Sequence, residues 1–215
     1  MTEFEKYVKS DFGINSTTLH DYKNSMTPMV IEEREMRAVS MSVFDRLMME
    51  RIIWCAGPVN DRMSIIVQAQ LMFLDSIGME DITLHVDTPG GSVKSGLGIV
   101  DVMDYIKCDI ATVNTGMAAS MGSILLGAGT KGKRSSLRFS KTMLHQSSGG
   151  AVGNIQDARI SMEEWEKTNA ILFDLLGGYC DKDPKQVMLD ATRDNWLTSE
   201  EALTYGIIDE VIGLK

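Results

Sequence analysis

The feature that most constrains the fold of this chain is a regular alternation of expected strands and helices. Segments typical of strands begin near positions 51, 81 and 108, and a helical pattern follows each of them. Their starts lie roughly 28 residues apart, close to the length of one βαβ unit. This recurrence predicts layered βαβ units, and 215 residues suit a single α/β domain built from them.

In the first half of the chain, residue patterns indicate where each expected element begins and ends. The strand at 81–88 alternates Ile82, Leu84 and Val86 with polar residues, so one of its faces is expected in the core. Gly57-Pro58 is a typical stop for the strand before it. The expected elements are, in order, a helix at 36–49, a strand at 51–56, a helix at 61–77, a strand at 81–88, a helix at 92–106, a strand at 109–115 and a helix from 120.

The second half departs from this rhythm. Glycines interrupt an extended stretch at 149–153, and a long helix is expected at 155–176, with Gly177-Gly178 as its stop. A helix of this length after a glycine-rich strand suggests a projecting arm. Thr198 to Glu201 form a capping-box pattern that starts a last short helix, and a strand at 207–212 closes the chain. The long helix carries an apolar stripe made of Ala158, Met162, Trp165, Leu172 and Leu175.

Charge and hydropathy exclude several classes of protein. The net charge is −9 and the densest basic stretch is only 131–134, which argues against a nucleic-acid-binding face. Polar residues interrupt the charge-free stretch at 110–130, so a membrane span is not expected there. Residues 1–28 are polar, without a sustained period or the apolar core of a secretory signal. We expect a mobile N-terminal extension or a propeptide at 1–28 and one domain at 29–215.

The cysteines indicate the compartment. Cys55, Cys108 and Cys180 are far apart and odd in number, and no CxxC pair or Cys/His cluster is present. A disulfide scaffold and a structural zinc site are therefore poorly supported. Reduced thiols in a soluble cytoplasmic protein are the simpler interpretation.

The three histidines can be compared by position. His20 lies in the polar extension and His85 lies inside a strand, where a hydrogen-bonded structural role is more common. His145 ends the apolar strand at 142–144 just before a loop, where catalytic groups are often found. If the protein carries out acid–base chemistry near neutral pH, His145 is the best candidate.

Ser120 is the best candidate nucleophile. It follows a strand and the small-residue link 116–119, and it precedes an apolar helix. The helix N-terminus would place unpaired N–H groups beside a developing oxyanion. The spacing is not that of the G-x-S-x-G elbow, and a serine at this kind of junction is often simply an N-cap.

Two further junctions are less decisive. Two glycines separate a strand from a helix at 87–92. Three interpretations of this segment are open: a tight turn, a loop that directs a backbone N–H into a cavity, and a phosphate-binding loop. The G-x-G-x-x-G and P-loop patterns are absent. Asp194 lies in a turn-like stretch before the last helix, and local patterns leave several other acids, such as Asp157 and Asp190, as alternatives.

These junctions, in this order, resemble the ClpP family of proteolytic subunits. Residues 116–122 (Gly-Met-Ala-Ala-Ser-Met-Gly) are similar to its serine motif, and Met143-Leu-His-Gln with Gly149-Gly150 is similar to its histidine motif. Residues 193–202 followed by 205–209 resemble its aspartate region, and Pro89 to Ser92 resemble its oxyanion loop. The resemblance runs from about Met29 to Gly213.

The resemblance implies a fold, a site and an assembly. The fold is an α/β, crotonase-like spiral of βαβ units, and its glycine-rich strand and long helix interlock two stacked heptameric rings. The implied triad is Ser120, His145 and Asp194, with oxyanion donors from the backbone N–H groups of Gly91 and Met121. The implied substrate-binding residues are Gly90, Ser92, Val93, Ser147, Ser148, Gly149 and Gly150.

The same resemblance implies partners and chemistry. An AAA+ unfoldase would use ATP to feed unfolded chains into the chamber, and the peptidase chain itself would need no metal or organic cofactor. The chain departs from the usual family pattern at three places: Asp87-Thr88 replaces Asn-Ser, Ser147-Ser148 replaces Pro-Leu, and Thr192 replaces an acid linked to ring pairing. The first two lie in the loops expected to line the substrate and bear on cleavage preference. The third bears on how strongly the two rings are coupled. A crotonase-type acyl-CoA hydratase and a silent assembly subunit are the rival interpretations.

Overall fold

A computed structural model describes residues 29–34, 37–148 and 154–213 of the chain. It forms two compact units, residues 1–50 and 51–215, and each is described by itself. The expected extension at 1–28 lies outside the described residues.

The first unit contains a hairpin and a short helix. Strand β1 (Met29–Arg34) pairs antiparallel with β2 (Arg37–Ser42), and α3 (Val43–Met49) follows directly. The helix expected at 36–49 is therefore wrong for residues 37–42, because strand pairing overrides the helical spacing there. The true helix start has a local signal: the Ser42 side chain accepts a hydrogen bond from the Asp45 N–H at 3.0 Å, and the Asp45 carboxylate accepts one from the Ser42 N–H at 3.3 Å.

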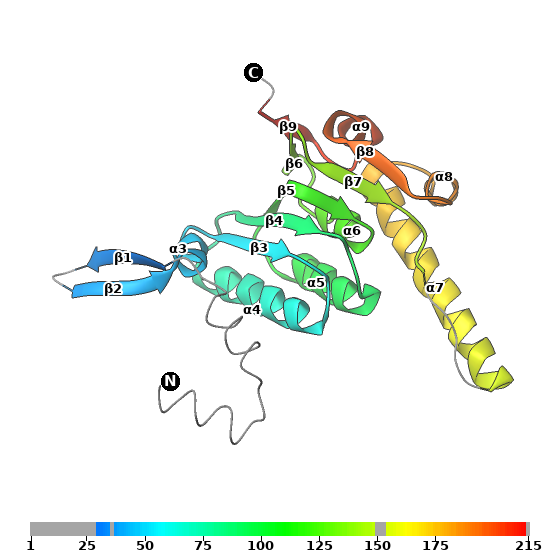
Figure 1. Cartoon of the computed structure of the whole chain (residues 1–215), viewed down its shortest axis with the longest axis horizontal. Helices are drawn as coiled ribbons and strands as arrows, with labels where there is room; N and C mark the ends of the chain where they lie inside the picture. Colours follow the sequence, from blue (N-terminus) through cyan, green and yellow to red (C-terminus); the bar gives the residue numbers. More distant parts are fainter. Residues whose placement is uncertain (1–28, 35–36, 149–153, 214–215) are drawn as a thin grey trace, which may run out of the picture. The chain divides into compact units, whose positions relative to one another are not determined.

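The second unit is built on a seven-stranded sheet in which six strands are parallel to their neighbours in the order β3-β4-β5-β6-β9, with β7 beside β5. Strand β8 pairs antiparallel with β7 (Figure 1). The strands are β3 (Ile52–Ala56), β4 (Ile82–Thr88), β5 (Ile110–Ala119), β6 (Arg134–Leu137), β7 (Lys141–Leu144), β8 (Asn195–Thr198) and β9 (Glu210–Ile212). Successive βαβ units confirm the expected α/β architecture.

Helices cover this sheet and form the core with it. Helices α4 and α5 lie side by side against β3 and β4, and α6 lies against β5 (Figure 1). The predicted core face of β4 is confirmed, since Ile82, Leu84 and Val86 are fully buried. The helices of this unit are α4 (Asp61–Ile77), α5 (Val93–Tyr105), α6 (Met121–Gly127), α7 (Ile155–Cys180), α8 (Pro184–Asp190) and α9 (Ser199–Tyr205).

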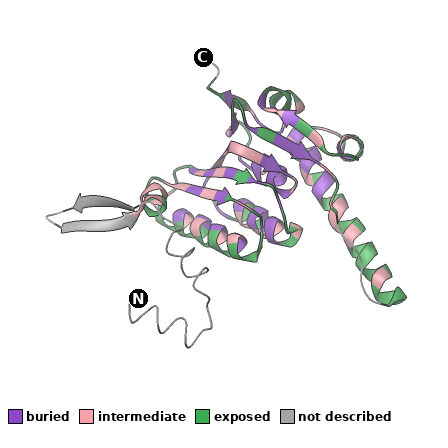
Figure 2. Ribbon diagram, in the orientation of Figure 1, coloured by how far each residue is buried: buried purple, intermediate pink, exposed green. Residues whose placement is uncertain are grey.

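Helix α7 projects from the sheet as an arm, as expected. Figure 2 shows its far half exposed, and its buried residues all lie in its last nine positions, from Leu172 to Cys180. The predicted stop at Gly177-Gly178 is wrong, because the helix continues through both glycines and ends at the left-handed cap Asp181. The glycine-rich stretch at 149–153 lies outside the described residues. No described helix combines the length and apolarity needed to cross a lipid bilayer.

Candidate active site

The register of the sheet brings three chain segments to one point. Ser120 directly follows β5 and His145 directly follows β7, and these parallel strands pair at Ala119 and Met143. Strand β8 runs antiparallel to β7 and pairs Asn195 with Leu144, so Asp194 comes opposite His145. The strand ends therefore gather a hydroxyl, an imidazole and a carboxylate that are far apart in the sequence.

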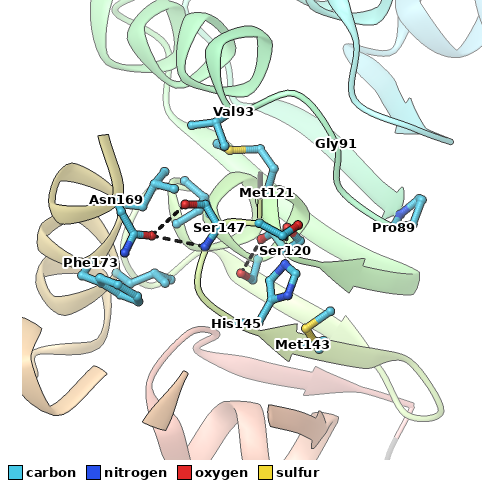
Figure 3. Close-up of a pocket in the computed structure, with 15 residues that line it drawn as sticks. Pro89, Gly91, Val93, Ser120, Met121, Met143, His145, Ser147, Asn169 and Phe173 are labelled. Carbon is cyan, nitrogen blue, oxygen red and sulfur yellow. Dashed lines mark hydrogen bonds between the residues drawn. The ribbon is translucent and has the colours of Figure 1, made fainter. Parts of the chain in front are cut away.

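The hydroxyl and the imidazole are in direct contact. Ser120 Oγ lies 2.8 Å from His145 Nε2, and Figure 3 shows the two side chains side by side. The Ser120 side chain makes no capping hydrogen bond to α6, although the residue stands at the N-cap position. The hydroxyl is thus directed at the imidazole and not at the helix end, which excludes the N-cap alternative.

The carboxylate lies on the other side of the imidazole. His145 Nδ1 is 3.4 Å from Asp194 Oδ1, and the Asp194 side chain is 64% exposed. The competing acids have partners elsewhere: Asp157 accepts a hydrogen bond from Asn154, and Asp190 accepts hydrogen bonds from Tyr205 and Gln186. Asp194 is therefore the acid that the strand register assigns to the imidazole.

The glycine loop after β4 lies against the same junction. Thr88 pairs with Ala118, two residues before Ser120, so this loop passes beside Ser120. A Cβ on Gly90 would come within 2.7 Å of Ser120 Cβ and 2.9 Å of Met121 N, and Gly90 has φ 87°. The Gly91 backbone lines the site, and a Cβ there would clash with the Val59 carbonyl oxygen. Glycine is therefore required at position 90 for the backbone to approach Ser120, and at position 91 for it to approach Val59.

A cavity of about 270 Å³ opens beside Ser120 and His145. Its walls come from the glycine loop, the start of α6, the segment after β7 and the inner half of α7 (Figure 3). Apolar side chains on α6 and α7 supply much of the lining, among them Ile124, Leu172, Phe173 and Leu176. The cavity is large enough to receive one side chain of a bound molecule next to Ser120.

Helix α7 also holds the segment that carries His145. Asn169 Oδ1 accepts hydrogen bonds from the Ser147 N–H and hydroxyl at 3.2 and 3.0 Å, and the Trp165 indole donates to the Ser147 hydroxyl at 2.5 Å. On the opposite side, the Gln146 N–H donates to the Ala191 carbonyl at 2.9 Å. Sequence reasoning missed Asn169, and it treated Trp165 only as part of an apolar stripe.

Three of the seven expected substrate-binding residues border the cavity, together with both expected oxyanion donors. Val93, Ser147 and Ser148 line it, as do Gly91 and Met121. Gly90 lies behind the lining against Ser120, and Ser92 caps α5 by accepting a hydrogen bond from the Ser95 N–H. The expected contacts at Gly149 and Gly150 lie outside the described residues.

Two other predicted positions have structural partners. His85 stacks on Trp54 in the sheet with ring centroids 4.5 Å apart, and burial lowers the pKa of its imidazole. The Thr192 hydroxyl donates to the Leu189 carbonyl at 2.9 Å. Neither side chain lines the cavity beside Ser120.

Comparisons with known proteins give consistent matches. A family model described as Clp protease matches residues 9–215. Two relatives named ATP-dependent Clp protease proteolytic subunit, from Porphyromonas gingivalis and Bacteroides fragilis, are 44% and 42% identical over 99% of this chain, and 98% and 99% of their own lengths are covered. A protein of the same name from Streptococcus pyogenes is 46% identical over 87% of this chain and 97% of its own length.

Proposed function

The chain belongs to the Clp protease family and is a serine-type peptidase, and from this premise we propose the roles of its site residues. Ser120 is the nucleophile, His145 is the general base and then the general acid, and Asp194 orients the imidazole. The observation that carries the proposal is the contact of 2.8 Å between Ser120 Oγ and His145 Nε2, with Asp194 3.4 Å from Nδ1.

The proposed reaction is acyl transfer. Ser120 Oγ attacks the scissile carbonyl carbon while His145 Nε2 takes its proton, and the imidazolium then protonates the leaving amine. Asp194 keeps the proton of the neutral imidazole on Nδ1 and stabilises the imidazolium. Water attacks the acyl-enzyme with His145 again acting as base, which releases the second product. This cycle needs no metal or organic cofactor on the peptidase chain.

We propose the N–H groups of Gly91 and Met121 as donors to the oxyanion. Met121 is the first residue of α6, where helical N–H groups have no partner within the helix. Gly91 is held beside the Ser120 junction by the close approach of its backbone to Val59. Loss of one such donor typically lowers the rate about 10²- to 10³-fold.

The proposed substrates are unfolded polypeptides. A chain without folded structure can lie extended between the backbone near Gly91–Val93 and that near Ser147 and Ser148, as an added strand. The cavity beside Ser120 would receive one of its side chains. In this binding mode the enzyme recognises the substrate mainly through its backbone and less through its side chains. Such broad recognition is expected of an enzyme for protein degradation and quality control.

The partner and the assembly follow from the same premise. The relatives are named proteolytic subunits of an ATP-dependent protease, so we propose that an AAA+ unfoldase uses ATP and delivers chains to this peptidase. We propose a homo-oligomer of two stacked heptamers, a tetradecamer, that encloses the sites. A cytoplasmic location fits Cys55, Cys108 and Cys180, all of which are free thiols.

The nucleophile assignment is tested with Ser120→Ala. The substitution should lower hydrolysis of a short fluorogenic peptide by a factor on the order of 10⁶ while leaving thermal unfolding and native mass unchanged. Ser76→Ala is the matched control, since its exposed hydroxyl bonds only the Phe73 carbonyl. A labelled fluorophosphonate should modify Ser120. Modification of another serine, or full turnover by Ser120→Ala, would contradict the assignment.

A further inference from the structure

Thr88 stands beneath the loop that carries Gly91. It is the last residue of β4 and is fully buried. Its hydroxyl donates to the Gly57 carbonyl at 2.6 Å and accepts a hydrogen bond from the Gly90 N–H at 3.0 Å. The hydroxyl therefore joins the start of the glycine loop to the turn after β3.

The methyl group of the same side chain reaches the other wall of the site. A Cβ on Gly122 would lie 2.7 Å from Thr88 Cγ2, so the methyl packs against the first turn of α6. That turn begins at Met121, the second proposed donor. One side chain thus contacts the loop that carries Gly91 by its hydroxyl and the helix that begins at Met121 by its methyl.

Val59 provides a second brace for the loop. Its N–H donates to the Gly90 carbonyl at 2.9 Å, and its own carbonyl accepts a hydrogen bond from the Ser92 N–H at 2.9 Å. The residues on both sides of Gly91 are therefore tied down, while the Gly91 N–H has no acceptor within the described part of the chain. An N–H held in this way is available to a bound substrate.

We infer that Thr88 is a positioning residue for the oxyanion hole: its hydroxyl fixes the Pro89–Gly90 peptide, and this limits the rotation of the following Gly90–Gly91 peptide, so that the Gly91 N–H faces the reacting carbonyl. This inference rests on the proposed function, because it takes Gly91 as an oxyanion donor. Donors act only within about 2.7–3.1 Å of the oxyanion, so a small turn of this peptide loses most of the stabilisation. Without the hydroxyl, the Gly90 N–H loses its acceptor, and the hydrogen bond from the Val59 N–H to the Gly90 carbonyl is the remaining restraint on this side of Gly91.

The test compares Thr88→Val with Thr88→Ser. Valine keeps the branched shape and the methyl beside Gly122 but removes the hydroxyl, while serine keeps the hydroxyl and removes the methyl. We expect Thr88→Val to lower kcat about 10- to 100-fold with KM changed less than about twofold. Thr88→Ser should stay within about threefold of the wild type, because the Gly90 acceptor remains.

A second readout separates positioning from general stability. A peptide aldehyde adds to Ser120 and forms a tetrahedral hemiacetal whose oxygen occupies the oxyanion position. Its affinity should fall in Thr88→Val by the same factor as kcat/KM, while native mass stays that of the wild type. If Thr88→Val fails to assemble, Thr88→Ala removes the hydroxyl without placing a methyl beside the Gly57 carbonyl, and the same losses are expected.

The outcomes distinguish this inference from the proposed function. Wild-type kcat in Thr88→Val, an equal loss in Thr88→Ser, or a raised KM at unchanged kcat would overturn the role of Thr88 and leave the triad standing. Failure of a fluorophosphonate to label Ser120 in the wild type would instead overturn the proposed function. A parallel loss of kcat and aldehyde affinity in Thr88→Val, restored in Thr88→Ser, supports the inference.

Discussion

Ser120 holds a backbone conformation that side-chain type and position in the sequence do not predict. Its φ of 55° and ψ of −120° are rare for a residue with a Cβ and mark a strained turn. The turn is secured on both sides, since the Ser120 N–H donates to the Met143 carbonyl at 2.9 Å and the Ser123 hydroxyl donates to the Ser120 carbonyl at 2.7 Å. With its backbone groups engaged in this way, the side chain is left to meet His145.

An ion pair between the buried Arg134 and the half-buried Asp209, at the β6–β9 edge of the sheet, gives a pH-dependent prediction. Burial alone would raise the pKa of Asp209, but hydrogen bonds and charge from Arg134 hold the pKa of this carboxyl below its ordinary value. Asp209→Asn leaves the buried Arg134 guanidinium without its counter-charge, so we expect the free energy of unfolding to fall by about 3–5 kcal/mol at neutral pH. Urea unfolding at fixed protein concentration measures this difference.

The sign of the pH effect follows from the lowered pKa. A carboxyl whose pKa is lower in the folded state stabilises the fold above its unfolded pKa, and this contribution is lost as the pH falls through the folded value. The difference between wild type and Asp209→Asn should therefore be constant from pH 8 to about 5 and shrink below about pH 4. Asp181→Asn is the control, because the exposed pair of Asp181 with Lys131 should contribute almost nothing. A difference that grows on acidification would contradict the assignment.

At the scale of elements, local patterns were sufficient where a segment's own periodicity decides its structure. The structure confirms the predicted bounds of α4 and the predicted capping box at the start of α9. Strand β2 was missed because its partner β1 decides its conformation, and β6 and α8 were not predicted. The end of α7 was misplaced because packing against residues beyond it carries the helix through two glycines.

The site residues also differ in how far local sequence patterns could identify them. Ser120 and His145 could be identified from their places at strand ends, and the structure brings them together. Asp194 could be separated from its rivals only by family resemblance, because its place opposite His145 comes from the register of β7 and β8. Asn169 carried no recognisable signal, since its hydrogen bonds to Ser147 join two elements that are 22 residues apart in the chain.

The two glycines within α7 form a matched pair for a test of this explanation. A Cβ on Gly178 would meet nothing within 4 Å, whereas a Cβ on Gly177 would lie 2.9 Å from the Lys182 carbonyl oxygen and 3.0 Å from Pro184 Cγ. Gly178→Ala should raise the free energy of unfolding by about 0.5–1 kcal/mol, because alanine favours the helix. Gly177→Ala should lower it, because the helix end must shift away from the Lys182–Pro184 turn. Thermal unfolding of both variants measures this, and stabilisation by Gly177→Ala would show that the contact with that turn is unimportant.

At the scale of the whole molecule, the described surface carries apolar side chains that the protomer leaves in solvent. Helix α4 buries one face through Val67, Leu71 and Leu74, yet its opposite side is apolar too. The projecting part of α7 adds a second exposed apolar set, which includes Ile155 and Ile160. Exposed apolar side chains gathered on one side of a helix are typical of a protein interface. The exposed apolar residues of α4 are Ile65, Ile66, Met72, Phe73 and Ile77.

We therefore predict that a second copy of the chain covers the exposed apolar side of α4. The wild type should show a native mass that is a multiple of 23.8 kDa, and Phe73→Glu should reduce it, because burial of that position against a neighbour would require an unpaired carboxylate to leave water. Lys185→Glu, an exposed charge change on α8, is the control and should keep the wild-type mass. Native mass spectrometry and light scattering measure the assembly, and peptide hydrolysis reports whether Ser120 and His145 stay aligned after it is lost. A wild-type mass of one protomer, or an unchanged mass in Phe73→Glu, would show that this side of α4 faces solvent in the working enzyme.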